Sequence, residues 1–323
     1  MNLPHTIPPA WPDATPSDRV AVLLRQHGLE SARVALLGLP DDLGVRLNGG
    51  RPGAAEGPAA IRDALARYGV GYDAETGRHF GETVADAGNV RPASPDELDG
   101  DAERALDETH RRVRETARAL HDAGKVVLAI GGGHDLTLPT VRALSERLGE
   151  PVGGVNLDAH LDVRETVGSG MPFRRLIEGG WLAADGFAEF GIGRFTAVGA
   201  HHEWLAERGA SIVPIDRARA AGEEGAASVL ERAVVGRSGA FVSIDLDGID
   251  SIAAPGVSAV NVDGLPPATA IRVAEAAGRD PRVRHFDVME LCPARDVDCR
   301  TARLAAHLVL TFLAAFEERP EQT

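Results

Sequence analysis

The sequence contains almost no lysine and almost no cysteine. Among its 323 residues, Lys125 is the single lysine, and Cys292 and Cys299 are the two cysteines. Lys125 is expected between a helix and a strand, so we expect no mechanism through a lysine Schiff base. Two cysteines are too few for a disulfide framework, and their spacing is not that of a zinc site. We therefore predict a reducing, cytoplasmic location.

Long apolar runs and a basic surface are also missing. No run approaches the ~20 residues that cross a bilayer, so we expect no membrane partner. The 34 basic residues are outnumbered by 48 acidic ones, and the net charge of −14 disfavours a nucleic-acid partner. Bound divalent cations would neutralise part of this charge. Residues 1–16 are proline-rich and lack the features of a signal peptide, so we predict an arm packed on the surface or on a neighbouring subunit.

Short apolar runs alternate with segments of helical periodicity. The expected strands are Val34–Leu39, Val126–Ile130, Gly154–Leu157, Thr196–Gly199, Ala240–Ile244 and Val283–Val288, and the expected helices are Ala59–Tyr68, Ala102–Ala123, Leu136–Leu148, Ala226–Val235, Pro267–Ala277 and Thr301–Phe316. This alternation predicts an α/β fold whose mostly parallel sheet is covered by helices on both faces. No linker-like stretch or repeat interrupts it, so we predict one domain over residues 1–323.

Metal-binding side chains follow three of the expected strands. The clusters are Asp158-Ala-His160-Leu-Asp162, Ser243-Ile-Asp245-Leu-Asp247 and Gly131-Gly-Gly-His134-Asp135. Alternate residues of a strand point to one side, so the side chains of the first cluster can converge on one point. Charged side chains are rarely buried unless they are paired or bound to a metal. In parallel α/β sheets the ligand site lies beyond the carboxyl ends of the strands, which is where all three clusters fall.

Six side chains are therefore candidate metal ligands: His134, Asp158, His160, Asp162, Asp245 and Asp247. This set exceeds what one ion needs, and oxygen-rich ligation with some imidazole suits Mn²⁺ better than structural zinc. A pair of ions ~3.5–4 Å apart would activate a bridging water and polarise an electrophile. Taken singly, the aspartates could instead cap turns, and Gly131–Gly133 could hold a phosphate at a helix N-terminus. The phosphate alternative would require a dinucleotide fingerprint or a P-loop lysine, and neither is found.

These motifs, with the Met289-Glu290 segment, resemble the ureohydrolase family of arginases, agmatinases and formimidoylglutamases. The resemblance covers the chain from about Leu36 to Phe316, with the motifs in the family's order. It implies an open three-layer α/β/α fold with a parallel sheet of about eight strands. It also implies two Mn²⁺ per subunit and a homo-oligomer, either a trimer or a hexamer.

By the same resemblance, the six candidates divide between two ions. One ion would be held by His134, Asp158, Asp162 and Asp245, and the other by Asp158, His160, Asp245 and Asp247, with Asp158, Asp245 and a hydroxide bridging. Glu290 would hydrogen-bond the amidine or guanidine nitrogens of a small-molecule substrate. The implied reaction is attack of the metal-bridging hydroxide on the amidine carbon, with Asp162 passing a proton to the leaving amine.

Three loops around these motifs resemble the formimidoylglutamase branch: residues 41–58, 162–174 and 254–259. Arg164, which follows the last carboxylate of the first cluster, could form a bidentate pair with a substrate carboxylate. The further candidates for substrate binding are Ser169, Arg46, Arg51 and Arg174.

One departure separates the chain from arginases and agmatinases. Met171, Pro172 and Phe173 occupy the stretch where those enzymes usually carry a proton-shuttle histidine. The pair His201 and His202 could substitute, but a surface or supporting role is the favoured interpretation.

The first functional hypothesis is hydrolysis of N-formimidoyl-L-glutamate to L-glutamate and formamide, a step of histidine breakdown. The two carboxylates of this substrate would explain several arginines at the site. The alternative within the class is a guanidinobutyrase or agmatinase that releases urea. A metal-binding relative without turnover would need a broken ligand set, and a related single-zinc deacetylase would carry fewer carboxylates. All six ligand positions are filled, so we predict a hydrolase.

Overall fold

A nine-stranded sheet forms the centre of the computed structural model, which describes residues 1–13, 15–69, 71–81 and 83–319. Its order is β1-β5-β2-β6-β11-β10-β7-β8-β9. In that order the strands are Thr6–Ile7, Val84–Val90, Val34–Leu39, Val126–Gly131, Val283–Met289, Ala240–Asp245, Val152–Leu157, Leu182–Ile192 and Ser211–Pro214. Only β1 pairs antiparallel within the described part of this sheet. The predicted, mostly parallel sheet is confirmed.

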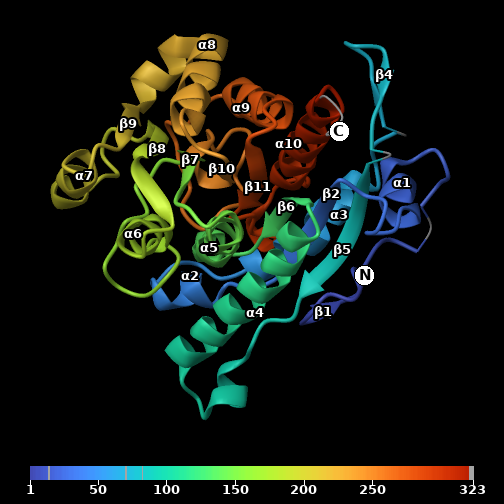
Figure 1. Cartoon of the computed structure of the whole chain (residues 1–323), viewed down its shortest axis with the longest axis horizontal. Helices are drawn as coiled ribbons and strands as arrows, with labels where there is room; N and C mark the ends of the chain where they lie inside the picture. The colour runs from blue at the N-terminus through green and yellow to red at the C-terminus, as the bar shows by residue number, and fades with distance from the viewer. Residues whose placement is uncertain (14, 70, 82, 320–323) are drawn as a thin grey trace.

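Helices cover both faces of this sheet (Figure 1). One layer contains α1 (Val20–Gln26), α3 (Gly57–Leu65), α8 (Ile215–Val234), α9 (Pro267–Arg279) and α10 (Arg300–Phe316), and the other contains α4 (Ala102–Asp122), α5 (Thr137–Leu148), α6 (Pro172–Glu178) and α7 (Gly199–Ala206). In Figure 1, α8, α9 and α10 lie along the top and α4 crosses the lower part. The predicted three layers are therefore present. No helix of the described ranges is long and apolar enough to cross a membrane.

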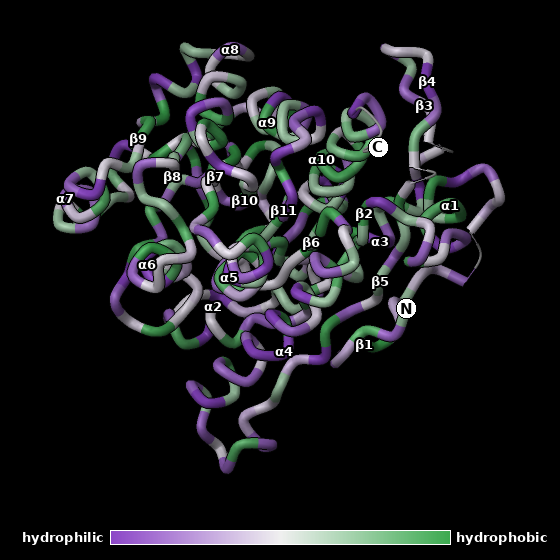
Figure 2. The backbone as a smooth tube through the Cα atoms, viewed as in Figure 1, coloured by the Kyte–Doolittle hydropathy of each residue, from purple (hydrophilic) through white to green (hydrophobic). Residues whose placement is uncertain are grey.

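The central strands are apolar on both faces, as parallel strands between two helical layers must be. In β2, Val34 and Leu36 belong to the core that includes α3, whereas Leu37 and Leu39 belong to the core that includes α4. Figure 2 shows the complementary pattern in the helices: α10 is largely hydrophobic, and the outer end of α4 is hydrophilic. This distribution leaves the ends of the strands as the places where polar side chains can gather.

The predicted strand at Thr196–Gly199 is wrong. Val198 is 56% exposed, and the segment leads into α7, which begins at Gly199. The strand of this region is β8, whose apolar residues are interrupted by Asp185 and Glu189. The helix predicted from Ala226 is the second part of α8, which begins at Ile215 and is broken by a non-helical backbone at Gly222 (φ 53°). Both differences arise because polar residues interrupt the regular spacing of apolar residues, which is what marks a helix or strand in a sequence.

Part of the predicted N-terminal arm lies against this chain itself. β1 pairs with β5, and the His5 imidazole lies 2.8 Å from a carboxylate oxygen of Glu115 on α4. Trp11 Nε1 donates a hydrogen bond of 2.8 Å to Asp86 on β5. Ala14, within the predicted arm, lies outside the described residues.

A buried ion pair explains why β5 escaped the sequence analysis. Asp86 and Asn89 interrupt the strand's apolar pattern, and both accept hydrogen bonds from the fully buried Arg62 of α3. Arg62 Nε and Nη2 donate to the two Asp86 oxygens at 2.8 Å each, and Nη1 donates to Asn89 Oδ1 at 2.7 Å. A buried carboxylate is thus matched by a bidentate guanidinium.

We expect Arg62→Met to lower the free energy of unfolding by about 3–5 kcal/mol, because it leaves the Asp86 carboxylate buried without its partner. Urea denaturation measures this change, and Arg67→Met at an exposed position is the matched control, for which less than about 0.5 kcal/mol is expected. Equal losses in the two variants would contradict the importance of the buried pair.

Candidate metal centre and active-site cavity

The three predicted clusters meet at the carboxyl edge of the sheet. Their strands, β6, β10 and β7, lie in the middle of the strand order, and β11 lies between β6 and β10. The side chains form two groups in which all ligand atoms lie within 4.8 Å of one another. The first group is His134, Asp158, Asp162 and Asp245, and the second is Asp158, His160 and Asp247. Asp158 belongs to both groups.

In the first group, His134 Nδ1 faces three carboxylate oxygens. It lies 2.9 Å from Asp162 Oδ2, 3.1 Å from Asp245 Oδ2 and 3.4 Å from Asp158 Oδ2. His134 is almost fully buried, yet its Nδ1 makes no hydrogen bond of acceptable geometry to any described residue. An unpaired buried nitrogen surrounded by oxygens is the donor set of a cation site.

The second group repeats this arrangement beside the first. His160 Nδ1 lies 3.3 Å from Asp158 Oδ1 and 3.3 Å from Asp247 Oδ1. Asp247 Oδ1 is buried and makes no hydrogen bond within the described residues. The two oxygens of Asp158 therefore face different groups, which is the geometry of a carboxylate that can bridge two ions. The residues fit a pair of divalent cations bound by oxygen and imidazole.

Burial and mutual repulsion perturb the protonation of these carboxylates. Burial, followed by repulsion from Asp158, raises the pKa of Asp247 from 3.8 to about 7. Burial and repulsion from Asp247 raise the pKa of Asp245 well above its ordinary value. Burial opposes ionisation of Asp158 too, but contacts with His134 and His160 outweigh it and lower the pKa of that carboxyl. Positive charge is therefore required to keep this set of carboxylates ionised together.

Two of the predicted functional residues have left-handed backbone conformations. The φ angle is 43° at Asp162 and 68° at Glu290. Glu290 N donates to the Gly132 carbonyl at 2.9 Å, and Glu290 Oε1 accepts a hydrogen bond of 2.9 Å from His134 N. These contacts hold an unfavourable backbone conformation and fix the Glu290 carboxylate beside the first group.

The glycine run before His134 is explained by close packing. A Cβ atom at Gly132 would lie 1.9 Å from the Asp41 carbonyl oxygen. Only glycine allows the β6 loop to approach the chain after β2 this closely. The alternative phosphate-binding interpretation of Gly131–Gly133 gains no support from this packing.

A cavity of about 310 Å³ opens above the two groups. Five of the predicted acidic or histidine residues line it: His160, Asp162, Asp245, Asp247 and Glu290. The other lining residues are Val45 of α2 (Leu43–Leu47), Asn48, Gly49, Gly50, Arg51, Arg164, Ser169, Gly170, Ser258 and Ala259. The carboxylates are mostly buried, whereas Arg51 and Arg164 are exposed. The cavity is thus acidic at its floor and basic at its mouth.

The five predicted substrate-binding residues separate into two sets. Arg164, Ser169 and Arg51 line the cavity. Arg46 and Arg174 are absent from its described lining: Arg46 Nε donates to Asp42 at 2.8 Å, and Arg174 contacts Glu165 and Glu178 at 2.9 and 3.0 Å. Both of these guanidiniums already have carboxylate partners.

Sequence reasoning assigned no role to two polar residues of the lining. Asn48 Oδ1 accepts a hydrogen bond of 2.9 Å from Arg164 Nη1. Ser258 Oγ accepts from Arg51 N at 2.8 Å, and the Ser258 carbonyl accepts from Arg51 Nε at 2.6 Å. The two residues hold the arginines at the mouth. Both residues lie in the loops that resemble formimidoylglutamases, and this resemblance is the feature of the sequence that could have pointed to them. His201 and His202 lie on α7, outside the described lining.

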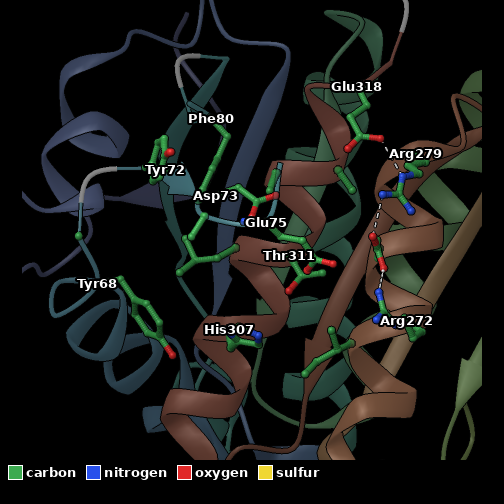
Figure 3. A pocket seen from close by; sticks show the side chains of 17 residues that line it. Tyr68, Tyr72, Asp73, Glu75, Phe80, Arg272, Arg279, His307, Thr311 and Glu318 are labelled. Atoms are coloured by element: carbon green, nitrogen blue, oxygen red, sulfur yellow. Dashed lines mark hydrogen bonds and ion pairs between the residues drawn. The ribbon is translucent and has the colours of Figure 1, made fainter. Parts of the chain in front are cut away.

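A second cavity, of about 360 Å³, lies beside the hairpin of β3 (Tyr72–Asp73) and β4 (Arg78–His79) and next to α9 and α10 (Figure 3). The two arginines of its described lining, Arg272 and Arg279, pair with glutamates of the same lining. Arg279 lies 2.7 Å from Glu275 and 2.8 Å from Glu318, and Arg272 lies 2.6 Å from Glu275. The two cavities share no described lining residue. The second therefore has no direct contact with the metal-binding groups.

Comparison with known proteins identifies the family to which this geometry belongs. A model of the arginase family matches residues 32–315. The chain belongs to the arginase family. It is accordingly a hydrolase that acts on amidine or guanidino C–N bonds.

Individual members of the arginase family are similar over most of their length. A formimidoylglutamase of Aromatoleum aromaticum is 36% identical, over 89% of this chain and 84% of that protein. The mitochondrial agmatinase of Gallus gallus is 29% identical, over 89% of this chain and 82% of that protein. The structure of Trypanosoma cruzi formiminoglutamase with Mn²⁺₂ has a TM-score of 0.84 and 30% identity, and the match covers 94% of this chain and all of that one. A relative of the same fold therefore holds a dinuclear manganese centre.

We expect the metal-free protein to lose stability as the pH rises from about 4 to 8, with Mn²⁺ restoring it at the upper end. A group whose pKa is raised by folding stabilises the fold below its unfolded pKa, and that stabilisation is lost as the pH rises through the folded pKa. Asp247, with a pKa raised to about 7, and Asp162 and Asp245, also raised, act in this direction.

Thermal unfolding of chelator-treated protein across this pH range measures the effect. Asp247→Asn should flatten the slope because it removes a group that binds a proton on folding. A wild-type melting temperature that rises over the same range would contradict the expectation.

Proposed function

We propose that the chain hydrolyses the formimidoyl C–N bond of N-formimidoyl-L-glutamate to give L-glutamate and formamide. The division of charge in the cavity carries the proposal. An acidic floor suits the cationic amidinium group, and Arg51 and Arg164 at the mouth suit the two carboxylates of the glutamate portion. The similarity to formimidoylglutamases of several organisms supports the same substrate.

In this proposal the two side-chain groups would hold two Mn²⁺ ions, and Asp245 of the first group would also contact the second ion. His134, Asp158, Asp162 and Asp245 would hold one, and Asp158, His160, Asp247 and Asp245 the other. When bound, such ions make water nucleophilic at neutral pH and polarise the amidine. The buried, unpaired His134 Nδ1 and Asp247 Oδ1 support this assignment.

The remaining steps fall to the chain's own side chains. Glu290, held through its Oε1, would orient the amidinium by a charge-assisted hydrogen bond from the substrate nitrogen. Asp162 Oδ2 faces His134, which leaves Oδ1 to carry a proton to the departing α-amine. Water adds to the amidine carbon, the bond to the glutamate nitrogen breaks, and formamide and the amine leave. Arg51 and Arg164 would position the substrate through its carboxylates.

The second candidate is hydrolysis of a guanidino compound with release of urea. The 29% identity to a mitochondrial agmatinase over 89% of this chain supports it. Agmatine has no carboxylate, however, and 4-guanidinobutyrate has one, so at least one of the two arginines at the mouth would have no substrate partner.

The deciding experiment is turnover by Mn²⁺-loaded protein with N-formimidoyl-L-glutamate, agmatine, arginine and 4-guanidinobutyrate in parallel. We expect formamide and glutamate from the first substrate, at a kcat/KM at least about 100-fold above the others, because each of the others lacks at least one of the two carboxylates. Urea as the principal product would overturn the proposed substrate and leave the family reaction in place.

Arg164→Ala should raise KM for N-formimidoyl-L-glutamate by about 10-fold or more and change kcat little, since the arginine binds ground and transition states alike. Steady-state kinetics measures both constants. Arg174→Ala is the matched control: its guanidinium is paired with Glu165 and Glu178, and we expect KM within about 2-fold of wild type. A fall in kcat at constant KM for Arg164→Ala would contradict the anchoring role.

His160→Ala should reduce the Mn²⁺ content by about half and remove most turnover, because His160 belongs to only one of the two groups. Elemental analysis and activity measure these changes, with His202→Ala on α7 as the control of the same residue type. Full Mn²⁺ content together with full activity in His160→Ala would rule out the dinuclear assignment.

A further inference from the structure

A row of four buried polar residues crosses the sheet directly beneath the metal-binding groups. Glu189 of β8 pairs in register with Asn156 of β7, Asn156 with Ser243 of β10, and Ser243 with Asp287 of β11. All four side chains are fully buried. Asn156 and Ser243 lie two residues before Asp158 and Asp245, so side chains of the row and of the ligands point to the same face.

One half of the row is connected to His134. Ser243 Oγ lies 2.9 Å from His134 Nε2 and donates to Asp287 Oδ1 at 2.5 Å. Asp287 Oδ2 accepts from Thr137 Oγ1 at 3.0 Å and lies 2.8 Å from His285 Nε2. Ser243 and Asp287 thus have polar partners outside the row in His134, Thr137 and His285.

The other half has an unusual balance of partners. Asn156 Nδ2 donates to Asp158 Oδ2 at 3.2 Å and to Glu189 Oε2 at 2.9 Å. An amide nitrogen carries two hydrogens, so these two carboxyl oxygens use both. Asn156 Oδ1 and Glu189 Oε1 are buried and have no hydrogen-bond partner within the described residues. If Glu189 served only to fill space in the core, an apolar residue at position 189 would make the fold more stable.

We propose that Glu189 is a positioning residue that orients Asp158 through Asn156. An amide can turn so that its oxygen and nitrogen exchange places. If the Asn156 amide were turned in this way, its Oδ1 would face the carboxyl oxygens of both Asp158 and Glu189, which repel it. Only the orientation in which Asn156 Nδ2 donates to Asp158 is therefore favourable. Asp158 is the one residue common to both described groups, and its Oδ2 faces the first of them.

The role requires Glu189 to present an acceptor at Oε2, so that any proton is carried on Oε1. Burial, with repulsion from Asp158, raises its pKa well above the ordinary value, and Oε2 can accept a hydrogen bond in either protonation state. The same reasoning makes glutamine an adequate replacement, because its amide oxygen can take the place of Oε2. Leucine, of similar size, offers no acceptor. This proposal rests on the proposed metal centre but not on the choice of substrate.

The test is the affinity of the metal-free protein for Mn²⁺. Calorimetry and the electron paramagnetic resonance signal of free Mn²⁺ both measure this affinity. We expect Glu189→Leu to weaken Mn²⁺ binding about 10- to 100-fold and Glu189→Gln to stay within about 3-fold of wild type. The melting temperature of the metal-free Glu189→Leu protein should equal or exceed that of wild type, since an unpaired buried acid is removed. Loss of metal affinity without loss of stability separates positioning from a structural role.

A double-mutant cycle tests whether Glu189 acts through Asn156. The double variant Glu189→Leu/Asn156→Ala should bind Mn²⁺ no more weakly than Asn156→Ala alone. Unchanged Mn²⁺ affinity in Glu189→Leu, or independent losses in the cycle, would overturn the proposal. Glu189→Ala provides a second truncation if the leucine variant does not fold, with the same expected loss. Wild-type protein that binds no Mn²⁺ would instead count against the proposed metal centre.

Discussion

Repulsion among four carboxylates at one end of the sheet is the constraint on which the rest of the site depends. Asp158, Asp162, Asp245 and Asp247 lie close enough to share ligand positions, and burial removes the water that would screen them. Two imidazoles are too little positive charge for this set, so divalent cations are the natural complement. The negative charge that opposes ionisation of these carboxylates together is the same charge that favours hard cations over other ligands.

The fold meets this constraint by placing each ligand where a parallel strand stops. The strand interiors are apolar on both faces, and the first polar positions after them point into a common space. Local departures from regular geometry complete the arrangement. Asp162 and Glu290 have positive φ angles, and Gly132 passes within contact distance of the Asp41 carbonyl. The two positive φ angles place Asp162 and Glu290 in the lining of the cavity, and the close approach at Gly132 brings the β6 loop, with His134, against the chain after β2.

The convergence of the candidate metal ligands could be predicted from the sequence because the signal is local: a short apolar run followed by alternating acids and histidines. β8 could not be found in this way, since Glu189 and Asp185 break its apolar pattern, and Glu189 pairs with Asn156 on the neighbouring strand.

The arginines show a similar limit of prediction from the sequence. Arg164 and Arg174 lie near each other in the sequence and follow the same cluster, yet Arg164 lines the cavity and Arg174 of α6 pairs with Glu165 and Glu178. Which arginine lines the cavity depends on tertiary contacts, and the spacing of residues in the sequence does not reveal these.

The polarity of the cavity also gives the substrate a direction. A molecule with a cationic amidine at one end and carboxylates at the other has a single favourable orientation between the acidic floor and the two arginines at the mouth. Asn48 and Ser258 fix those arginines through hydrogen bonds, so the mouth is ordered before the substrate arrives. A guanidine that lacks carboxylates would meet the same floor but offer the arginines no carboxylate partner. Discrimination within the family can therefore lie in the loops, while the reaction centre at the strand ends stays the same.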